Sequence, residues 1–391
     1  MTKYLIIGGG IAGTTAAERI RKLDPTGAIT IIDLEQHRLY SRVLLAKYVE
    51  GQIEREKIFL KREQWYSEQN IELMSGVEVV SIDAKNQFVL TSEGRELPYE
   101  KLLITTGGEV KLLPEDLRGV SYLRTLDDAD HLIKLIAELR TLPSDQQAAA
   151  IFGGGFISLE YINIFAHYNI NTTILMRSLG FWSRVMSKST QDILLSHAVA
   201  RGMAVKFEER DLSLIGKNEI EGLELKDGSI LPTRLLGVGI GLEMKTKIFL
   251  DAGLEVQNGL LVNSYLETNL PNIYAAGDIV EFHDVIAGRR LRAGNWMSAI
   301  MQARAVASTM TGKRTEFRLV SSYSASLLGM QIVFVGDTSR EHADEVIQHI
   351  EGDDHATELF VRGGKLVGGI MVGDTRERQE ITKAIQEGGM L

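Results

Sequence analysis

Short apolar runs alternate with helix-like stretches along much of the chain. Residues 3–7 are an apolar run typical of a buried strand, and residues 12–20 follow as a helix pattern with small side chains on one face. Residues 28–32 form a second apolar run, which ends at Asp33. Because buried strands alternate with a helix, the pattern predicts an α/β fold with a parallel sheet.

Three glycines in G-x-G-x-x-G spacing, Gly8, Gly10 and Gly13, separate the first strand from the first helix. The first permits a tight turn, the second lets a pyrophosphate approach the backbone, and the third lets helix and strand pack closely. The helix N-terminus around Ala12 offers N–H groups and partial positive charge to phosphates. Asp33 lies about twenty residues further on, where an acid binds a ribose hydroxyl. Together they predict a dinucleotide site, with an ordinary glycine turn as the alternative.

A second copy of this unit begins in the middle of the chain. A strand pattern at residues 148–152 leads into a glycine turn, a helix pattern follows from residue 159, and a further strand pattern covers residues 172–176. The turn contains Gly153, Gly155, Phe156 and Ile157. An internal duplication of this kind predicts two dinucleotide sites in one chain.

The second copy departs from the first at two positions. Ser158 replaces the third glycine, so the helix and strand must separate slightly or the hydroxyl must be accommodated. Arg177 replaces the acid, with Arg184 nearby. An arginine cannot accept a hydrogen bond from a ribose hydroxyl, but it can pair with a 2′-phosphate. This favours NADPH; the alternative is a solvated arginine, with NADH held through the backbone.

The remaining patterns outline further elements. Residues 125–128 resemble a helix N-terminus with an acid in its first turn, and the apolar positions predict a helix through residue 139. We also expect one strand at 231–240, a buried strand at 272–278, a helix at 295–310, strands at 331–335, 358–361 and 366–372, and a short helix at 376–386.

Composition narrows the class of protein. The 391 residues are 44% apolar and 24% charged, as in a soluble globular protein. The net charge of −9 argues against a nucleic-acid binder. The absence of cysteine excludes disulfides, thiolate metal sites and iron–sulfur clusters on this chain, and no metal site is predicted. We expect no membrane span, no signal or transit peptide and a cytoplasmic location.

The chain resembles the pyridine nucleotide–disulfide oxidoreductases, which are flavoprotein reductases. The resemblance rests on the two glycine turns and on residues 103–107 and 274–278. Residues 40–47 resemble the Tyr-x-Arg-Pro-x-Leu-Ser-Lys stretch of the ferredoxin and rubredoxin reductase branch, which lacks the redox disulfide. The resemblance implies two Rossmann-like dinucleotide-binding domains and a small α+β C-terminal domain. The implied bounds are 1–115 and 238–315 for the FAD domain, 116–237 for the NAD(P) domain, and 316–391 for the C-terminal domain.

The resemblance also assigns site residues. FAD would lie on the first glycine turn, with Asp33 or Glu35 binding the adenosine ribose, and NAD(P)H would lie on the second. Lys47 would lie beside the flavin ring, and Glu160 matches the acid that pairs with this lysine. The other implied FAD contacts are Arg42, Thr106, Gly107, Gly277, Asp278, Asn295 and Trp296.

The implied activity is transfer of a hydride from NAD(P)H to flavin, followed by electron transfer to a small carrier of the rubredoxin or ferredoxin type. The basic cluster Arg289, Arg290 and Arg292 can dock an acidic carrier, or can be a solvated loop. Two alternatives stay open. The acceptor can be a small molecule such as a quinone, a nitro compound or dioxygen. The second nucleotide site can also have decayed, leaving an FAD-bound binding protein. A homodimer is compatible with the family.

Overall fold

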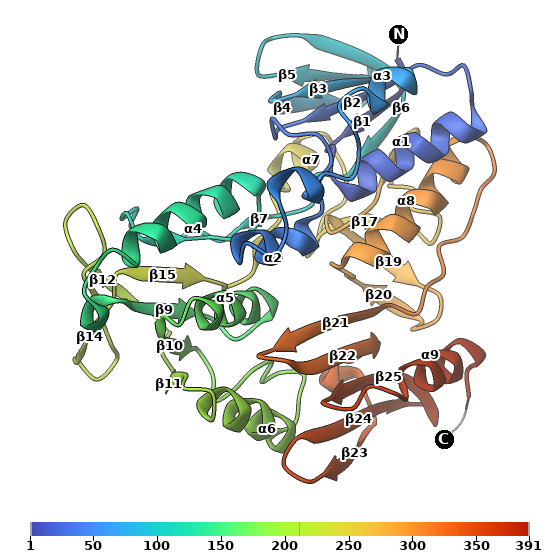
Figure 1. Cartoon of the computed structure of the whole chain (residues 1–391). Helices are drawn as coiled ribbons and strands as arrows, with labels where there is room; N and C mark the ends of the chain where they lie inside the picture. Colours follow the sequence, from blue (N-terminus) through green and yellow to red (C-terminus); the bar gives the residue numbers. More distant parts are fainter. Residues whose placement is uncertain (1, 211, 390–391) are drawn as a thin grey trace. The chain divides into compact units, whose positions relative to one another are not determined.

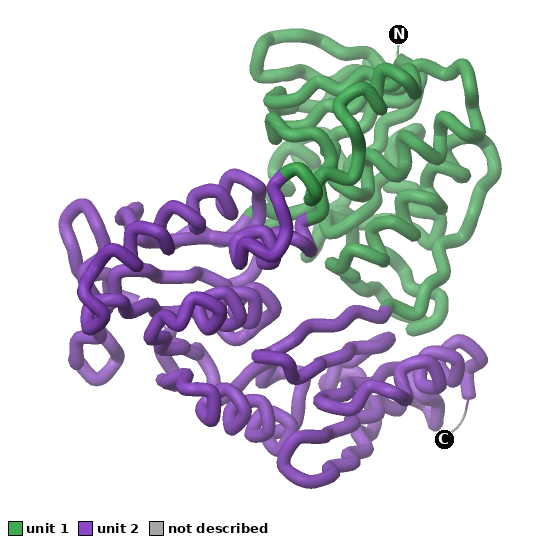
Figure 2. The backbone as a smooth tube through the Cα atoms, viewed as in Figure 1, with its two compact units in different colours: residues 1–41, 56–109, 243–321 green, residues 42–55, 110–242, 322–391 purple. Residues whose placement is uncertain are grey.

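The computed structural model describes residues 2–210 and 212–389, which form two compact units (Figure 2). Unit 1 takes up residues 1–41, 56–109 and 243–321, and unit 2 takes up residues 42–55, 110–242 and 322–391. The predicted division into FAD, NAD(P) and C-terminal domains remains a prediction. None of the described helices is both long enough and apolar enough to cross a bilayer.

Unit 1 is built on a seven-stranded sheet in the order β3-β2-β1-β6-β5-β4, with β18 paired to β6 (Figure 1). β1, β2, β3, β6 and β18 run parallel, whereas β5 pairs antiparallel with β4 on one side and with the first half of β6 on the other. The strands are β1 (Thr2–Ile7), β2 (Ile29–Asp33), β3 (Ile71–Ser75), β4 (Val79–Asp83), β5 (Phe88–Thr91), β6 (Glu96–Ile104) and β18 (Ile273–Ala275).

Helices and a smaller sheet complete unit 1. The first helix, α1, packs along α8, which lies much later in the chain, and small buried alanines let the two helices approach (Figure 1). The smaller sheet has the order β17-β19-β20. The elements are α1 (Ile11–Leu23), α3 (Trp65–Glu68), α7 (Lys247–Asp251), α8 (Trp296–Met310), β17 (Leu260–Val262), β19 (Val280–Asp284) and β20 (Arg289–Leu291).

Unit 2 repeats the parallel arrangement in the order β11-β10-β9-β15-β8. α4 begins as its sequence predicts, because the side chain of Thr125 accepts the N–H of Asp128 and the Asp128 carboxylate accepts the N–H of Thr125. The elements are β8 (Val120–Ser121), β9 (Ala148–Phe152), β10 (Asn171–Met176), β11 (Ala204–Phe207), β15 (Leu235–Val238), α2 (Leu45–Val49), α4 (Leu126–Leu139), α5 (Phe156–His167) and α6 (Lys188–Val199).

Two sequence expectations for this part of unit 2 were wrong. The helix after the second glycine turn begins at Phe156 rather than at residue 159, because Gly155 is already its N-cap. The single strand expected at 231–240 is two strands in different sheets. Pro232, which has no N–H to donate, ends β14 (Ile230–Pro232) in a hairpin sheet with β12 (Ser213–Ile215) and β13 (Gly222–Glu224), before β15 joins the parallel sheet.

The C-terminal part of unit 2 is an antiparallel sheet in the order β21-β22-β25-β24-β23, packed against α9. The sequence prediction found the apolar β22, β24 and β25 but missed the two edge strands, whose side chains are mainly polar or exposed. The elements are β21 (Ser322–Leu327), β22 (Met330–Gly336), β23 (Glu345–Glu351), β24 (His355–Arg362), β25 (Lys365–Val372) and α9 (Arg378–Glu387). Two of the boundaries between the units fall within β7 (Glu109–Val110) and β16 (Leu242–Glu243).

The two copies differ in which element, the helix or the strand, carries the smaller residue where the two pack together. Thr105 and Gly239 are equivalent, because each donates its N–H to the last residue of the first strand of its copy, over 2.8 Å. In the first copy, a Cβ on Gly13 would lie 1.9 Å from the Gly8 carbonyl oxygen and 2.8 Å from the Thr105 hydroxyl.

In the second copy the bulk lies on the helix instead. Ser158 is fully buried, and a Cβ on Gly239 would lie 2.7 Å from its hydroxyl oxygen. In the first copy the larger residue of the pair, Thr105, follows the strand, whereas in the second copy the larger residue, Ser158, is on the helix. The absence of a side chain at Gly239 leaves room for this serine. The Ser158 hydroxyl has no hydrogen-bond partner among the described residues.

Exchanging the two solutions tests this pairing. We expect Gly239→Thr to lower the free energy of unfolding by about 2 kcal/mol, because its side chain enters space that Ser158 fills. Adding Ser158→Gly should restore about 1 kcal/mol or more, since residues in contact do not behave additively. Thermal unfolding of the wild type, both single variants and the double variant would measure the coupling, and strictly additive effects would refute it.

Candidate dinucleotide sites

The first glycine turn leaves a helix N-terminus exposed to a ligand. Gly10 is the N-cap of α1, no side chain caps the helix, and its first turn contains no acid. A side chain at position 10 would meet no protein atom within 4 Å. Because the first N–H groups of a helix need acceptors, this open and uncapped end fits an anionic group such as a pyrophosphate.

Hydrogen bonds between neighbouring segments hold the first turn in place. Gly8 has a φ of +102°, and its N–H donates to the carbonyl of Ile32 over 2.7 Å. The Thr14 hydroxyl donates to the Gly9 carbonyl over 2.7 Å, and the Thr105 hydroxyl lies 2.8 Å from the Gly8 carbonyl oxygen. The turn is therefore held by contacts of the chain itself.

The two candidate ribose-binding acids have different surroundings. The Asp33 carboxylate borders the glycine turn, since a Cβ on Gly9 would lie 2.5 Å from its Oδ2 atom. The Glu35 carboxylate accepts the hydroxyl of Tyr40 over 2.6 Å. Asp33 is thus the acid at the turn itself, whereas one oxygen of Glu35 is engaged by a neighbouring side chain.

The end of β18 adjoins the same helix. Gly277 has a φ of +90°, and a Cβ there would lie 3.2 Å from that of Ala12 on α1. Its N–H donates to the side chain of Gln302 over 2.7 Å, and the Gln302 amide donates to Ser298 over 3.0 Å. These two buried hydrogen bonds join the end of β18 to α8 and thereby position Asp278, which follows Gly277.

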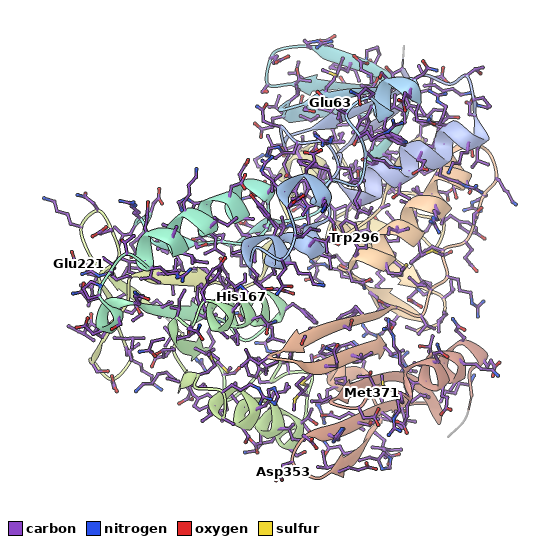
Figure 3. The ribbon with its side chains drawn as sticks, in the orientation of Figure 1. Glu63, His167, Glu221, Trp296, Asp353 and Met371 are labelled. Atoms are coloured by element: carbon purple, nitrogen blue, oxygen red, sulfur yellow. The ribbon has the colours of Figure 1, made fainter. Side chains whose placement is uncertain are left out.

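The N-terminus of α8 differs from that of α1 because a side chain, that of Asn295, caps it. Asn295 accepts the N–H of Ser298 over 2.9 Å and donates to the hydroxyl of Ser321 over 2.7 Å. Trp296 is half-buried in the first turn (Figure 3). Thr106 and Gly107 follow β6, where Thr106 is exposed and Gly107 has a φ of +66°.

The second glycine turn is also uncapped. Gly155 is the N-cap of α5 without a capping side chain, the first turn has no acid, and Gly153 has a φ of +132°. A side chain at position 155 would meet no protein atom within 4 Å. The backbone therefore offers the same anion site as in the first copy. Phe156 is 37% exposed and Ile157 is half-buried.

Arg177 follows β10, where the first copy has Asp33. It is exposed, and the structure gives it no hydrogen bond or ion pair with another residue of the described chain. Its guanidinium is thus available to an anion. The arrangement is compatible with a 2′-phosphate at this position and equally with a solvated arginine.

Three charged residues gather where α2 packs on α5. Lys47 is exposed on α2, Glu50 follows this helix, and Glu160 lies on α5. Burial, and to a smaller extent the charge of Glu50, raises the pKa of Glu160 to about 7, while Lys47 acts in the opposite direction. No ion pair between Lys47 and Glu160 is present in the described chain. The implied pairing is therefore present only as a longer-range attraction.

Burial also raises the pKa of Glu50, against the charges of His167 and Lys47. His167 ends α5 (Figure 3). The hydroxyl of Tyr168, the next residue, donates to the Val49 carbonyl over 2.6 Å and fixes the end of α2. No sequence pattern points to Glu50, because a glutamate after a short helix is an ordinary surface residue.

The remaining predicted residues have structural partners. Arg42 donates to the Arg124 carbonyl over 2.5 Å within unit 2. In the basic cluster, Arg290 donates to the Val262 carbonyl over 3.2 Å, so part of its charge serves the small sheet of unit 1. Arg292 is exposed. The cluster therefore offers fewer uncommitted cations to a carrier protein than the sequence suggests.

Comparison with known proteins places these sites in context. A family model described as pyridine nucleotide-disulphide oxidoreductase matches residues 2–305, and one described as rubredoxin NAD+ reductase C-terminal domain matches residues 326–389. A nitrite reductase (NAD(P)H) of Bacillus subtilis (strain 168) is 27% identical over 392 residues, which cover 98% of the chain. The chain spans about half of that relative, 47% of its length.

Other relatives match over most of their length. A rubredoxin-NAD(+) reductase of Pseudomonas putida is 28% identical over 337 residues, covering 85% of the chain and 86% of the relative. The reductase in the crystal structure of a covalent putidaredoxin reductase–putidaredoxin complex has a TM-score of 0.91 and 25% identity, covering 99% of the chain and 93% of its own. With a family match that takes in both glycine turns, the chain belongs to the pyridine nucleotide-disulphide oxidoreductase family.

Proposed function

We propose that the chain is an FAD-dependent NAD(P)H oxidoreductase that passes electrons on to a small electron-carrier protein. The observation that supports it best is the presence of two uncapped helix N-termini behind glycine turns, at Gly10 and Gly155, in one chain of this family. Two anion-binding turns suit two dinucleotides, and the reaction needs one as hydride donor and one as acceptor.

We assign FAD to the first turn and the nicotinamide nucleotide to the second. The N–H groups of α1 would hold the FAD pyrophosphate, Asp33 the adenosine ribose, and Asp278 the ribityl or pyrophosphate part. When bound, NAD(P)H and FAD supply the hydride chemistry between the nicotinamide and flavin rings. The chain supplies binding and orientation for it, and no protein group has to act as a general acid.

The same assignment gives Arg177 and Lys47 electrostatic roles. Arg177 would pair with a 2′-phosphate, which favours NADPH over NADH. Lys47 would stabilise negative charge on the flavin ring, and the raised pKa of Glu160 means that its carboxyl group changes charge near neutral pH. Protonation of Glu160 removes one of the two carboxylate charges near Lys47, which strengthens the effect of Lys47 on a nearby anion.

The acceptor is proposed from the relatives. Two relatives, rubredoxin-NAD(+) reductase and putidaredoxin reductase, are named after a small carrier protein. Their names favour a partner of this kind for the present chain. Nitrite reductase names a small molecule, and that relative is about twice as long as the chain, so a small-molecule acceptor is the second candidate. A cytoplasmic location and a homodimer remain parts of this proposal, testable by cell fractionation and by sedimentation.

Anaerobic titration of the FAD-loaded chain tests the reductase proposal. We expect NADPH to bleach the oxidised-flavin absorbance, and Arg177→Ala to weaken NADPH binding about tenfold or more, as loss of a charge-assisted hydrogen bond does. NADH binding should change by less than about twofold, because NADH lacks the phosphate.

The control for this titration is Arg201→Ala, which removes another exposed arginine of unit 2. Bleaching by NADH alone would keep the reductase but exclude the role of Arg177. If FAD-loaded protein is bleached by neither nucleotide, the chain is not a reductase and the decayed-site alternative gains support.

The raised pKa of Glu160 predicts a pH dependence of stability. The pKa of Glu160 is about 7 in the folded chain, against an ordinary value of 4.5. Between these two pH values the carboxyl group is therefore protonated in the folded state and ionised in the unfolded state. Folding stability therefore falls as pH rises through this window. At pH 8 we expect Glu160→Gln to raise the free energy of unfolding by on the order of 1–3 kcal/mol relative to the wild type, which thermal unfolding would show as a higher Tm. This gain should disappear as the pH is lowered towards 4.5.

The matched control is Glu63→Gln, an exposed glutamate of unit 1 (Figure 3). Its effect on Tm should stay the same between pH 5 and pH 8. A Glu160→Gln variant whose difference from the wild type does not change with pH would show that Glu160 titrates in its ordinary range.

A further inference from the structure

The segment between β10 and α6, residues 177–187, is called here the recognition loop. It begins at Arg177, beside the second dinucleotide turn, and ends at Ser187, the N-cap of α6. In the proposed function this loop faces the part of the nucleotide that distinguishes NADPH from NADH. Its geometry therefore matters for nucleotide binding, and its contacts show what fixes that geometry.

The C-terminal sheet holds the far end of the recognition loop. Glu358 on β24 is completely buried, and its Oε1 atom accepts both the N–H and the hydroxyl of Ser187, each over 2.8 Å. Arg340 forms an ion pair with the other carboxylate oxygen of Glu358. The Nε of Arg340 also donates to the carbonyl of Val185, inside the loop, over 3.1 Å.

The middle of the loop is fixed to both the glycine turn and the C-terminal sheet. The N–H of Trp182 donates to the carbonyl of Gly154 over 3.3 Å. Its ring centre lies 4.8 Å from that of Phe156 and 5.3 Å from that of Phe334 on β22. Trp182 has a φ of +43°, a strained conformation for a bulky residue that persists only when surrounding contacts impose it.

Stability alone does not account for the pair of Glu358, which is completely buried, and Arg340, whose side chain is 33% exposed. The attraction between the two charges is offset by the hydration that the buried Glu358 carboxylate loses completely and that Arg340 loses in part. The hydrogen bonds of the pair, by contrast, have fixed directions, and here three of them end on Ser187 and Val185 of the loop. The pair is thus suited to set the position of the loop.

We propose that Arg340 and Glu358 are positioning residues for the second dinucleotide site. Through Val185 and Ser187 they hold the recognition loop so that Arg177 and the turn at Gly155 can engage one nucleotide together. The C-terminal sheet is then part of the nucleotide-binding apparatus, although neither residue touches the nucleotide. This inference rests on the proposed function of the second turn.

The test is calorimetric binding of NADP+ and of NAD+ to the FAD-loaded full chain. Arg340→Lys keeps a positive charge opposite Glu358, but one ammonium group cannot reproduce the two directed bonds of the guanidinium. We expect NADP+ to bind roughly three- to thirtyfold more weakly, the range over which remote positioning residues act. The limiting rate of flavin reduction at saturating NADPH should stay within about twofold of the wild type, since bound nucleotide is unaffected.

Asn163→Ala is the matched control. Asn163 on α5 also bonds the C-terminal part of unit 2, at Ser326 of β21 and at Leu328 just after it, and has no hydrogen bond to the recognition loop among the described residues. NADP+ affinity should remain within about twofold of the wild type in this variant. Glu358→Gln, compared at equal folded fraction by circular dichroism, should weaken NADP+ binding as Arg340→Lys does.

Wild-type NADP+ affinity in a folded Arg340→Lys variant would overturn the proposal, as would an equal loss of affinity in Asn163→Ala. A lower limiting rate without a loss of affinity would also overturn it, because the pair would then act on the reaction and not on binding. Wild-type protein that holds FAD but binds neither nucleotide would instead defeat the proposed function itself, and this inference with it.

Discussion

The sites in this chain depend on backbone N–H groups that the protein itself leaves without a capping side chain. α1 and α5 each begin at a glycine, with no polar side chain at the N-cap and no acid in the first turn. Side chains cap three of the other described helices, with Thr125 on α4, Ser187 on α6 and Asn295 on α8, whereas α2, α3, α7 and α9 have no capping side chain but begin after a residue other than glycine. The two glycine N-caps lie at equivalent positions in the two copies, so we attribute them to the sites.

The duplicated unit shows which features of a site can vary. Both copies keep a glycine with positive φ at the first position of the turn, because the chain must reverse there. The third position of the motif is not fixed by itself. Gly13 beside Thr105 and Ser158 beside Gly239 are two ways of sharing one small space between helix and strand. A missing motif glycine is therefore informative only together with the residue that faces it.

Much of this fold could be predicted because its signals are local. The α/β fold and the family are confirmed, since glycine spacing, apolar strands and the Thr125 cap all lie within short segments. The long-range contacts could not be predicted. Glu50 approaches Glu160 only when α2 packs on α5, and Glu358 meets Ser187 across 171 positions of sequence. Neither the residue types nor their spacing in the sequence predicts that these residues lie close together. The roles of the individual site residues remain predictions.

The order of segments along the chain has a consequence for synthesis on the ribosome. The parallel sheet of unit 2 needs only residues 120–238, so it can form as soon as that stretch has emerged. The sheet of unit 1 starts earlier but is completed later, because β18 and α8 come from residues 273–310. A nascent chain that stops short of these residues leaves β6 with one edge bare and α1 without its neighbour, although every glycine of the first turn is already in place.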